Sequence, residues 1–487
     1  MINSYNVTQL RNAGKIINLP FCLSLDGSDN TLNCEKLLRI IPGKRVVLLG
    51  TWGNHKIVAK LFFKPLQINN HVRREASGIK ALLKAGISTP DLLFSGKTKD
   101  KGVGVLLFKY IFPSTELGKF WGAVKSVEEK RNLVYKLMVI LSKMHKVGIK
   151  QLDLHLNNFL VNNNTIYIID GATIKWDKRG RPLKLHDRIN NLALLFAQFT
   201  LPDYSLVCDL YTEYIKTSGL KNKKNTFKKL QCQIERWRRW RVRNHIKANF
   251  YKYSKLVRRK SFTRFMLCKR PYYTRAMASF LDNPDKIINN PKSLFLKKGN
   301  SATVIRINID NHDLVVKRYN IKNFRHRLRR FLRPSRATHS WRSAHLLLML
   351  GIATPMPVAI LERRFGYFRG RAYFAYEYID GLNAIDYFKS GDLDKELDVA
   401  KRIADIFQNL AIAKISHHDM KGTNIIINQR YPVLVDLDAM CMHISDRRFE
   451  HAHKRDKKIF LNNWPDTSDV SKLFKDLLYR NKVDFLK

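Results

Sequence analysis

Apolar and polar residues near the start of the chain follow the pattern of a β-hairpin and then of a helix. Residues 44–63 contain two β-type runs around a Gly-Asn turn, and the second run carries Lys60 in a Val-Ala-Lys sequence. Residues 71–85 repeat apolar side chains with a helical period and place Glu75 in the first turns, which predicts an amphipathic helix. The segment Gly86-Ile-Ser-Thr-Pro90 ends this helix and leads into a further pair of strands.

The remainder of the first half has mainly the periodicity of helices. Residues 133–145 form a strongly amphipathic pattern, and residues 191–199 and 206–215 are expected to be further helices. Residues 225–270 are also helical by period and densely basic, and Pro271 is a stop signal. The sequence therefore predicts a β-rich part followed by a helical part.

The second half repeats this order of patterns. Residues 295–308 and 313–319 predict a hairpin whose last strand carries Lys317 in a Val-Val-Lys sequence. A helix is predicted over 337–350, and it ends at Gly351-Ile-Ala-Thr-Pro355, which matches the corresponding segment of the first half. Recurrence of a whole series of elements indicates an internal duplication.

A polar motif is also present twice, at equivalent places in the two halves. In each copy an Asn follows an Asp by five residues, and a second Asp ends a β-type run twelve residues after that Asn. The interval from the preceding Gly-Ile-x-Thr-Pro glycine to the first Asp is 67 residues in one copy and 68 in the other. The residues concerned are Asp153, Asn158 and Asp170, and Asp419, Asn424 and Asp436.

This order of residues is typical of kinase-like enzymes, in which catalysis consists mostly of positioning and of neutralising phosphate charge. Lys60 and Lys317 are predicted to hold the α- and β-phosphates of ATP, and Glu75 to pair with the first of these lysines. Asp153 and Asp419 are predicted to accept the proton of the acceptor hydroxyl. The Asn and the second Asp of each copy are predicted to bind Mg²⁺, which prefers oxygen ligands.

The predicted fold class is α+β, with two tandem protein-kinase-like domains that each have a small β-rich N-lobe and a helical C-lobe. We expect the first domain at 1–225, a basic helical connector at 226–285 as a C-lobe extension, and the second domain at 286–487. A length of 487 residues with 45% hydrophobic content is sufficient for two packed domains.

The second copy lacks the helix glutamate. No acidic residue lies between Lys317 and the end of the following helix, and the position equivalent to Glu75 is Ser340. Lys317 must therefore be held in another way, or the second copy is weakened.

The first copy lacks a good phosphate-binding loop, because its Gly50–Gly53 segment is short and bulky. Gly299, Asn300 and Ser301 in the second copy are better suited to bind phosphate through backbone N–H groups. Each copy thus lacks something that the other has, and whether one of them is a pseudokinase stays open.

Three further acids have two interpretations each. Asp187 and Asp456 follow the second Asp of the motif by about twenty residues, where kinase-like folds often have an acid that caps the backbone of the catalytic loop. A solvated charge on a helix explains either of them equally well. Asp438 is a second metal ligand or a structural residue, and its place beyond a turn favours the structural role.

Four segments resemble the lipopolysaccharide kinase family, whose bacterial members phosphorylate Kdo or heptose in the lipid A–core. They are Asp-Leu-His-Leu-Asn-Asn-Phe-Leu from residue 153, Ile-Ile-Asp-Gly-Ala from 168, Gly-Ile-Ala-Thr-Pro-Met-Pro from 351 and His-His-Asp-Met-Lys-Gly-Thr-Asn-Ile-Ile from 417. The resemblance covers about 40–240 and 290–470. It implies ATP and Mg²⁺ as cofactors, a heptose or Kdo hydroxyl of the lipopolysaccharide core as acceptor, and a peripheral location at the cytoplasmic face of the inner membrane.

Two other functions fit the same residues. Aminoglycoside phosphotransferases and atypical protein kinases share the motif skeleton, so a protein or a small molecule is an alternative acceptor. A basic, non-catalytic pseudokinase scaffold at a membrane or on RNA is the other alternative, and an absence of Mg·ATP binding would support it.

The net charge of +49 predicts an acidic partner. Residues 221–275 hold twenty Lys and Arg with interleaved aromatic residues and one acid, Glu235, and residues 322–345 add seven arginines. Such segments fit an anionic membrane surface or nucleic acid, and a solvated face over core aromatics is the structural alternative. The membrane is preferred because lipid A and its core carry phosphates and carboxylates, and nucleic acid is expected to bind only non-specifically.

The six cysteines show no paired or metal-type spacing, which favours a reducing compartment and ordinary core thiols. The N-terminus lacks the layout of a signal peptide, and the longest apolar runs are far short of a membrane span. The sequence thus predicts a soluble or peripheral protein.

Overall fold

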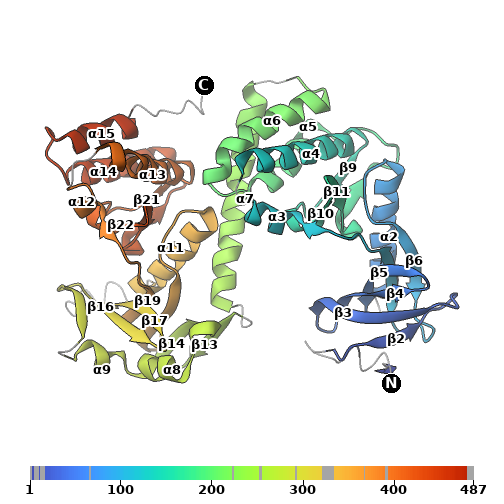
Figure 1. The fold of residues 1–487 in the computed structure, drawn as a ribbon, viewed down its shortest axis with the longest axis horizontal. Helices are drawn as coiled ribbons and strands as arrows, with labels where there is room; N and C mark the ends of the chain where they lie inside the picture. Colours follow the sequence, from blue (N-terminus) through green and yellow to red (C-terminus); the bar gives the residue numbers. More distant parts are fainter. Residues whose placement is uncertain are drawn as a thin grey trace. The chain divides into compact units, whose positions relative to one another are not determined.

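The structure is a computed structural model in which the chain divides into two units. The residues described are 3–4, 10, 17–64, 67–124, 126–221, 224–251, 255–290, 293–320, 334–366, 368–389 and 393–479. The first unit comprises Met1–Phe199 and Ser205–Trp237, and the second comprises Thr200–Tyr204 and Arg238–Lys487. The colours of Figure 1 run from blue to green along the first unit and from green to red along the second.

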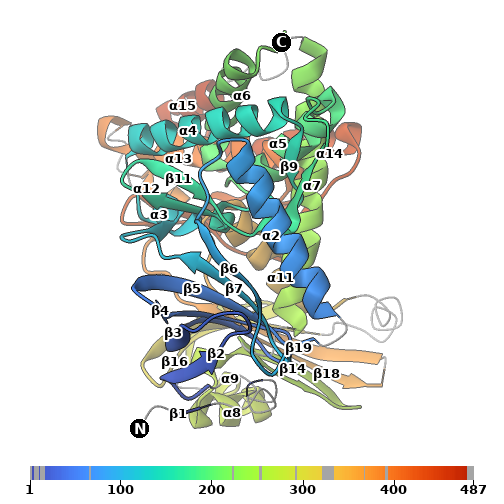
Figure 2. The ribbon, with the colours of Figure 1, turned by 90° about the vertical axis from the view of Figure 1, so that its right-hand side faces the viewer.

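A large β-sheet forms the N-terminal part of the first unit. Its described strands have the order β1-β2-β3-β4-β5-β7-β6. They are β1 (Asn3–Ser4), β2 (Phe21–Ser24), β3 (Thr31–Ile41), β4 (Arg45–Trp52), β5 (His55–Phe62), β6 (Leu92–Lys97) and β7 (Gly104–Lys109). Helix α2 (Ile68–Lys84) follows β5 and packs against β6 and β7 (Figure 2).

The rest of the first unit is mainly helical. Its helices are α3 (Leu117–Ala123), α4 (Val127–Lys146), α5 (Leu185–Phe196), α6 (Ser205–Ser218) and the first part of α7 (Lys224–Tyr251). Two small sheets consist of β8 (Thr115–Glu116) with β10 (Phe159–Asn162) and β11 (Thr165–Ile168), and of β9 (Ile149–Gln151) with β12 (Ile174–Trp176). These short strands lie on both sides of the Asp153–Asn158 segment and therefore position it.

The second unit repeats this arrangement with a sheet whose described strands have the order β13-β14-β18-β19-β17-β16-β15. The strands are β13 (Leu256–Lys260), β14 (Arg264–Lys269), β15 (Leu294–Lys298), β16 (Ala302–Ile309), β17 (His312–Tyr319), β18 (Pro357–Phe365) and β19 (Phe368–Glu377). Strands β15 to β19 have the same order and pairing as β3 to β7 of the first unit. The predicted duplication is therefore present in the topology as well as in the motifs.

Apart from α8 and α9, the helices and small sheets of the second unit also match those of the first. The helices are α8 (Arg275–Asp282), α9 (Pro284–Ile288), α11 (Arg336–Leu350), α12 (Ala384–Tyr387), α13 (Leu393–Ile412), α14 (Asp446–Leu461) and α15 (Asp469–Tyr479). The small sheets consist of β20 (Leu382–Asn383) with β22 (Ile425–Asn428) and β23 (Tyr431–Leu434), and of β21 (Ile415–Ser416) with β24 (Cys441–Met442). As in the first unit, they flank the catalytic-loop motif.

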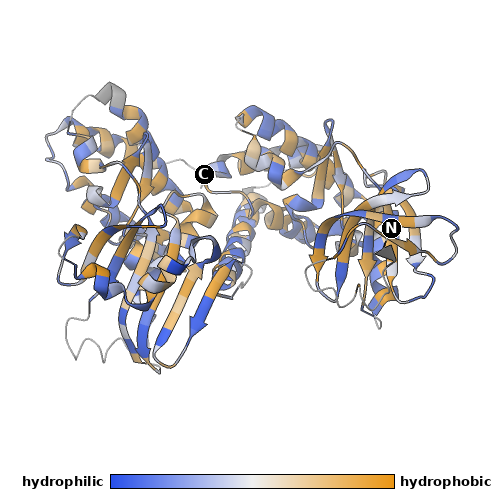
Figure 3. Ribbon diagram, turned by 60° about the horizontal axis from the view of Figure 1, so that its bottom comes forward, coloured by the Kyte–Doolittle hydropathy of each residue, from blue (hydrophilic) through white to orange (hydrophobic). Residues whose placement is uncertain are grey.

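Alternating hydropathy explains how each large sheet acquires a buried face (Figure 3). In β4, fully buried residues alternate with half-buried ones, as expected for a strand covered on one side. Each unit has its own apolar core, with Phe21 and Leu48 in the first and Trp341 and Phe460 in the second. Among the described residues, no helix is long and apolar enough to cross a bilayer.

The predicted helix over 225–270 is wrong in its second part. Helix α7 ends at Tyr251, and β13 and β14 form a hairpin that extends the large sheet of the second unit through β18. The run Phe265–Cys268 is buried throughout, and this burial between neighbouring elements outweighs a weak helical period. The segment 226–285 is therefore not a helical connector along its whole length.

Candidate active sites

The lysine of the first unit is held by a buried glutamate. The Lys60 ammonium on β5 contacts the Glu75 carboxylate on α2. The two oxygens of Glu75 also accept hydrogen bonds from the backbone N–H groups of Gly171 (3.1 Å) and Ala172 (3.2 Å). Burial alone would raise the pKa of Glu75, but the Lys60 ammonium and hydrogen bonding hold this pKa below its usual value. The glutamate therefore joins the strand lysine to the loop that follows Asp170.

Helix α2 comes close to this loop because two glycines face each other. A Cβ atom on Gly78 would lie 2.0 Å from the carbonyl oxygen of Gly171. A Cβ atom on Gly171 would lie 2.3 Å from the carbonyl oxygen of Glu75. A larger side chain at either place would push the helix from the loop, since packed interiors leave no spare volume.

The catalytic-loop motif of the first unit is hydrogen-bonded to the strand end that carries Asp170. Asn158 donates from Nδ2 to the backbone carbonyl oxygen of the exposed Asp153 at 2.8 Å. The backbone carbonyl oxygen of Asn158 accepts from the Ile169 N–H at 2.9 Å. Asp170 has a left-handed backbone (φ 73°), and its buried Oδ1 has no hydrogen-bond partner among the described residues. Burial raises the pKa of Asp170, and the Glu75 carboxylate raises it further.

Neutral amides support the catalytic loop of the first unit. Asn191 on α5 donates from Nδ2 to the Gln151 carbonyl oxygen at 2.7 Å. Asp187, for which capping was one of two interpretations, forms an ion pair with Lys150, 2.8 Å from Oδ1 to Nζ. The capping interpretation therefore does not hold for Asp187, because the residue one helical turn later faces the loop in its place.

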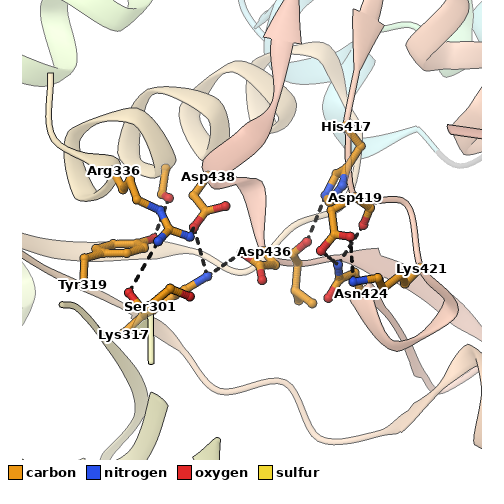
Figure 4. Close-up of polar contacts among 12 residues, drawn as sticks. Ser301, Lys317, Tyr319, Arg336, His417, Asp419, Lys421, Asn424, Asp436 and Asp438 are labelled. Carbon is orange, nitrogen blue, oxygen red and sulfur yellow. Dashed lines mark hydrogen bonds and ion pairs between the residues drawn. The ribbon is translucent and has the colours of Figure 1, made fainter. Parts of the chain in front are cut away.

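The lysine of the second unit is held without any helix glutamate. The Lys317 ammonium contacts the Asp436 carboxylate and lies 3.2 Å from Oδ2 of Asp438. The guanidinium of Arg336, in the first turn of α11, forms an ion pair with the same oxygen of Asp438 (Figure 4). Burial opposes ionisation of Asp438, but Lys317 and Arg336 hold its pKa below the usual value. The carboxylate has thus moved from the helix to the loop, and a cation occupies the helix.

Ser340 is too short to replace the missing glutamate. Its hydroxyl lies 2.8 Å from the Tyr319 hydroxyl. Ser340, Lys317 and Asp436 contribute to the lining of a cavity of about 20 Å³, which has room for roughly one water molecule. Because Ser340 cannot hold Lys317, this role falls to Asp438. This is the structural role that was expected for Asp438.

The catalytic loop of the second unit has an additional lysine that the sequence analysis missed. Lys421 lies two residues after Asp419, and its Nζ is 2.9 Å from Oδ1 of that aspartate. Asn424 donates from Nδ2 to the Asp419 carbonyl oxygen at 2.8 Å and to Oδ2 at 3.2 Å. The Asn424 carbonyl accepts from the Val435 N–H at 2.9 Å, so the loop is joined to the strand end at Asp436. The Asp-x-Lys-x-x-Asn spacing was the available signal, and His155 occupies the lysine position in the first unit.

Asp456 caps this loop, as one of its two interpretations required. Its carboxylate accepts from the backbone N–H groups of His417 (2.7 Å) and His418 (2.8 Å). His418 has a left-handed backbone (φ 65°), a strained conformation that the two hydrogen bonds stabilise.

The turn of the first unit that corresponds to Gly299–Ser301 is not the Gly50–Gly53 segment. Gly50 lies in β4, and Gly53 lies in the turn between β4 and β5 rather than before β4. Lys60 pairs with Val47, and Lys317 pairs with Val304, so the Gly299–Ser301 turn corresponds to residues 42–44. Gly50–Gly53, which the sequence already indicates to be a poor phosphate-binding loop, therefore lies at a different turn, because strand register and not glycine content sets the position.

The Gly299–Ser301 turn is attached to the lysine network. The Ser301 carbonyl accepts from the Asn320 N–H at 3.1 Å and from Nη1 of Arg336 at 3.4 Å. The Gly299 N–H donates to the Ala302 carbonyl at 3.1 Å. Arg336 therefore links this turn to Asp438.

The Gly-Ile-x-Thr-Pro segments have a structural role that the spacing did not reveal. Thr89 donates from Oγ1 to the Ile168 carbonyl at 2.8 Å, and Thr354 donates to the Leu434 carbonyl at 2.7 Å. Each acceptor lies two residues before the second Asp of the motif. The segment therefore attaches the β-rich lobe to the strand that carries this Asp.

A family model described as lipopolysaccharide kinase (Kdo/WaaP) matches residues 50–204 and 292–467. The chain belongs to the lipopolysaccharide kinase (Kdo/WaaP) family. Each matched segment contains one complete copy of the lysine, Asp-x4-Asn and second-Asp series. The family membership and the α+β, tandem kinase-like fold class predicted from the sequence are thereby confirmed.

The chain is also similar to a solved structure. The structure, titled "WaaP in complex with acyl carrier protein", is 18% identical, with a TM-score of 0.34, and the match covers 42% of this chain and 88% of that chain. No curated protein sequence matches the chain.

Proposed function

We propose that this Kdo/WaaP-family protein is an ATP- and Mg²⁺-dependent kinase that phosphorylates a heptose or Kdo hydroxyl of the lipopolysaccharide inner core at the cytoplasmic face of the inner membrane. The observation that carries the proposal is geometric. In each unit hydrogen bonds join the segments that carry a strand lysine, a catalytic-loop aspartate and a strand-end aspartate. The connection runs through Glu75 and the backbone of the loop in the first unit, and through the direct contact of Lys317 with Asp436 in the second. This set supplies a phosphate contact, a proton acceptor and a cation ligand, which are the main requirements of phosphoryl transfer.

The acidic and amide oxygens of both sites suit Mg²⁺. Asn158 with Asp170, and Asn424 with Asp436, would hold the ion, which when bound would neutralise charge on the ATP phosphates. The buried, unpartnered Oδ1 of Asp170 supports a cation at that place, because a buried acceptor without a partner is unfavourable. The raised pKa of Asp170 agrees, since a cation would offset the nearby negative charge.

The strand lysines are proposed to bind the nucleotide phosphates. Lys60 is oriented by Glu75, and Lys317 is oriented by Asp436 and Asp438. In the second unit the Gly299, Asn300 and Ser301 backbone is proposed to cover the phosphates, with Arg336 holding the turn in place. Both units therefore have an oriented lysine, although they obtain it from different carboxylates.

Asp153 and Asp419 are proposed as the proton acceptors. Asp419 is the better ordered of the two, because Lys421 and Asn424 each contact one of its carboxylate oxygens. Holding a reacting group in one direction lowers the entropic part of the barrier. Lys421 also adds positive charge beside the place where phosphate would be transferred.

Exposed aromatic side chains beside basic residues support an anionic membrane as partner. The turns after β13 and β18 are joined by a hydrogen bond from the Gly366 N–H to the Phe262 carbonyl at 2.9 Å. The rings of Phe262 and Phe365 are in edge contact, with centroids 4.7 Å apart, and are 61% and 64% exposed. We call Phe262, Phe365 and Phe368 the aromatic tip. Exposed basic residues on the adjoining strands are Arg259, Lys260, Arg363 and Arg371.

An aromatic tip with flanking arginine and lysine fits a bilayer interface, where rings enter the headgroup region and cations meet anionic lipid. Trp240 on α7 is also 52% exposed, whereas Phe250 packs on the core of the second unit. Of the arginines predicted to extend the basic surface, Arg336 contacts Asp438 and Arg342 stacks on Phe250 at 5.2 Å. The others lie outside the described residues: Arg325, Arg327, Arg329, Arg330 and Arg333.

The proposal is tested by Mg²⁺-dependent ATP turnover with purified lipopolysaccharide core, for the wild type and for Asp170→Ala and Asp436→Ala. We expect the wild type to transfer phosphate to the core. Loss in one variant alone would identify the working unit, and loss in both would mean that both units act or depend on each other.

Two outcomes would favour the alternatives. Turnover that does not depend on the core, with phosphate found on another molecule, would indicate a different acceptor. Absence of both turnover and ATP binding in the wild type would indicate a non-catalytic scaffold.

A further inference from the structure

Three side chains that commonly bind metals meet beside the catalytic loop of the second unit. β21 and β24 are antiparallel, with Ser416 opposite Cys441. His418 and His443 each follow one of these paired residues by two positions. One ligand atom from each of His418, Cys441 and His443 lies within 4.8 Å of the other two. We call these three residues the His–Cys cluster.

The two imidazoles are joined through one buried hydroxyl group. Nε2 of His418 lies 2.9 Å and Nε2 of His443 lies 2.6 Å from the hydroxyl oxygen of Ser416, which is fully buried. One hydroxyl can donate to one imidazole and accept from the other, so neither ring needs to be protonated.

The backbone on both sides of the cluster is also held in place. The His418 N–H is bound by Asp456 at 2.8 Å, and the His443 N–H donates to the Lys414 carbonyl at 2.8 Å. Ligands whose positions are set by such surrounding hydrogen bonds lose little freedom when a metal binds. Cys441 is exposed, so a metal ion can reach the cluster from solvent.

We propose that His418, Cys441 and His443 form a binding site for one zinc-class divalent cation. Two imidazole nitrogens and one thiolate are the donors that Zn²⁺ prefers, whereas Mg²⁺ prefers oxygen. On binding, the Cys441 thiol loses its proton to solvent, the sulfur and the two nitrogens take three tetrahedral positions, and water takes the fourth. The site is therefore chemically distinct from the Mg²⁺ sites proposed at Asn424 and Asp436.

The location gives this site a consequence for the catalytic loop. His418 directly precedes Asp419, so a bound cation would fasten the start of that loop to β24. The proposal itself does not rest on the kinase activity, because metal binding can be measured in the absence of ATP and lipopolysaccharide.

The test is metal binding by the full-length protein with Zn²⁺ or Co²⁺ alone. We expect one Zn²⁺ per chain after dialysis, and a sulfur-to-cobalt charge-transfer band when Co²⁺ is used. Cys441→Ser and His443→Gln should each weaken Zn²⁺ binding by more than about 100-fold, since even loss of an outer hydrogen bond costs about 10- to 100-fold. Cys232→Ser, at another exposed cysteine, should bind as the wild type does.

Three results would overturn the proposal. They are absence of bound Zn²⁺ in the wild type, wild-type affinity in both Cys441→Ser and His443→Gln, and Co²⁺ binding without the charge-transfer band. Because Cys441 is exposed, its serine variant is expected to fold, and a thermal melt equal to that of the wild type checks this. The cobalt spectrum of the wild type keeps the proposal testable even if the histidine variant does not fold.

Discussion

Asp438 lies 3.2 Å from the Lys317 ammonium in the second unit, where the first unit uses Glu75 for the same purpose. The two carboxylates come from different elements, a loop in one unit and helix α2 in the other. Arg336 places a positive charge on the helix instead of a negative one and contacts the same Asp438 oxygen as Lys317. The two halves of the duplication therefore orient an equivalent lysine by different routes.

Replacing Asp438 should impair the second site while the fold persists. Asp438→Asn leaves Lys317 with Asp436 alone, and a misplaced phosphate contact is expected to lower turnover at that site by about 100-fold. Turnover should be measured in an Asp170→Ala background, so that only the second unit contributes. Ser340→Glu added to Asp438→Asn should restore part of the loss, whereas Ser340→Ala should have little effect. Equal activity of Asp438→Asn and the wild type would contradict the assigned role.

Removal of either catalytic-loop aspartate should abolish phosphate transfer at its own site. A general base contributes typically about 10²- to 10⁴-fold, so Asp153→Ala and Asp419→Ala are each expected to lose at least about 100-fold at the affected site. Asp153 is exposed, so its variant should melt at the wild-type temperature. Phosphorylated product from each single variant should be compared with the double variant. If neither change alters transfer, the base assignment is wrong.

A methyl group on Gly78 should disturb the first site. Gly→Ala in a helix usually stabilises by about 0.5–1 kcal/mol, but here the added Cβ would meet the Gly171 carbonyl oxygen at 2.0 Å. We expect Gly78→Ala to lower the melting temperature and the nucleotide affinity of the first unit. Gly122→Ala in α3 is the matched control, because a Cβ there meets nothing within 4 Å. A Gly78 variant at least as stable as the Gly122 variant would argue against the close contact.

Acid should destabilise the first unit through His145. Burial lowers the pKa of His145 from its ordinary 6.5 to about 4. Between these values the unfolded chain binds a proton that the folded unit does not, so stability is full above pH 6.5 and is lost as pH falls toward 4. The loss is on the order of 3 kcal/mol, since one pKa unit corresponds to about 1.4 kcal/mol.

The check on His145 is urea unfolding at several pH values, for the wild type and for His145→Gln. The difference in unfolding free energy between the two proteins should shrink as pH falls, because glutamine does not titrate. Tyr214 and Asn191 hydrogen-bond to the two ring nitrogens at 2.8 and 3.0 Å, so some loss at neutral pH is expected. If the difference in unfolding free energy does not change with pH, His145 is not a buried neutral histidine with a lowered pKa.

The aromatic tip should govern binding to anionic vesicles. Burying one phenylalanine ring contributes about 1.5–3 kcal/mol, so Phe262→Ser with Phe365→Ser is expected to weaken binding to phosphatidylglycerol vesicles by at least about 100-fold. Phe112→Ser is a suitable control, since Phe112 is 76% exposed but lies in the first unit. Vesicle sedimentation at two salt concentrations gives the measurement. If the control variant loses as much vesicle binding as the tip variant, or if the tip variant loses none, any binding observed is due to the charge and not to the aromatic tip.

Periodicity and spacing were sufficient for the duplicated motif and for the hairpins and helices that carry it. Hairpins with Lys60 and Lys317, the helices after them and the two Asp-x4-Asn loops all depend on residues close in sequence, and local patterns express these directly. The helix over 225–270 failed in its second part because burial of Phe265–Cys268 in a sheet depends on β18, about one hundred residues away.

Contacts between distant elements could not be predicted in this way. Lys317 and Asp438 are 121 residues apart, and Arg336 and Asp438 are 102 residues apart, so their meeting depends on how α11 packs beside the strand end. The choice of Asn191 over Asp187 depends on which side of α5 faces the loop. The turn of the first unit that corresponds to Gly299–Ser301 follows from strand register, and the His–Cys cluster follows from the pairing of β21 with β24.

The sequence by itself therefore determined which residue types were available for chemistry and where they recur, because spacing along a strand or helix is a local property. Packing determined which of them meet, because a side chain finds its partner only after separate elements have docked. The missing glutamate illustrates the difference. Its absence could be counted in the sequence, but its replacement by Asp438 and Arg336 required the folded second unit.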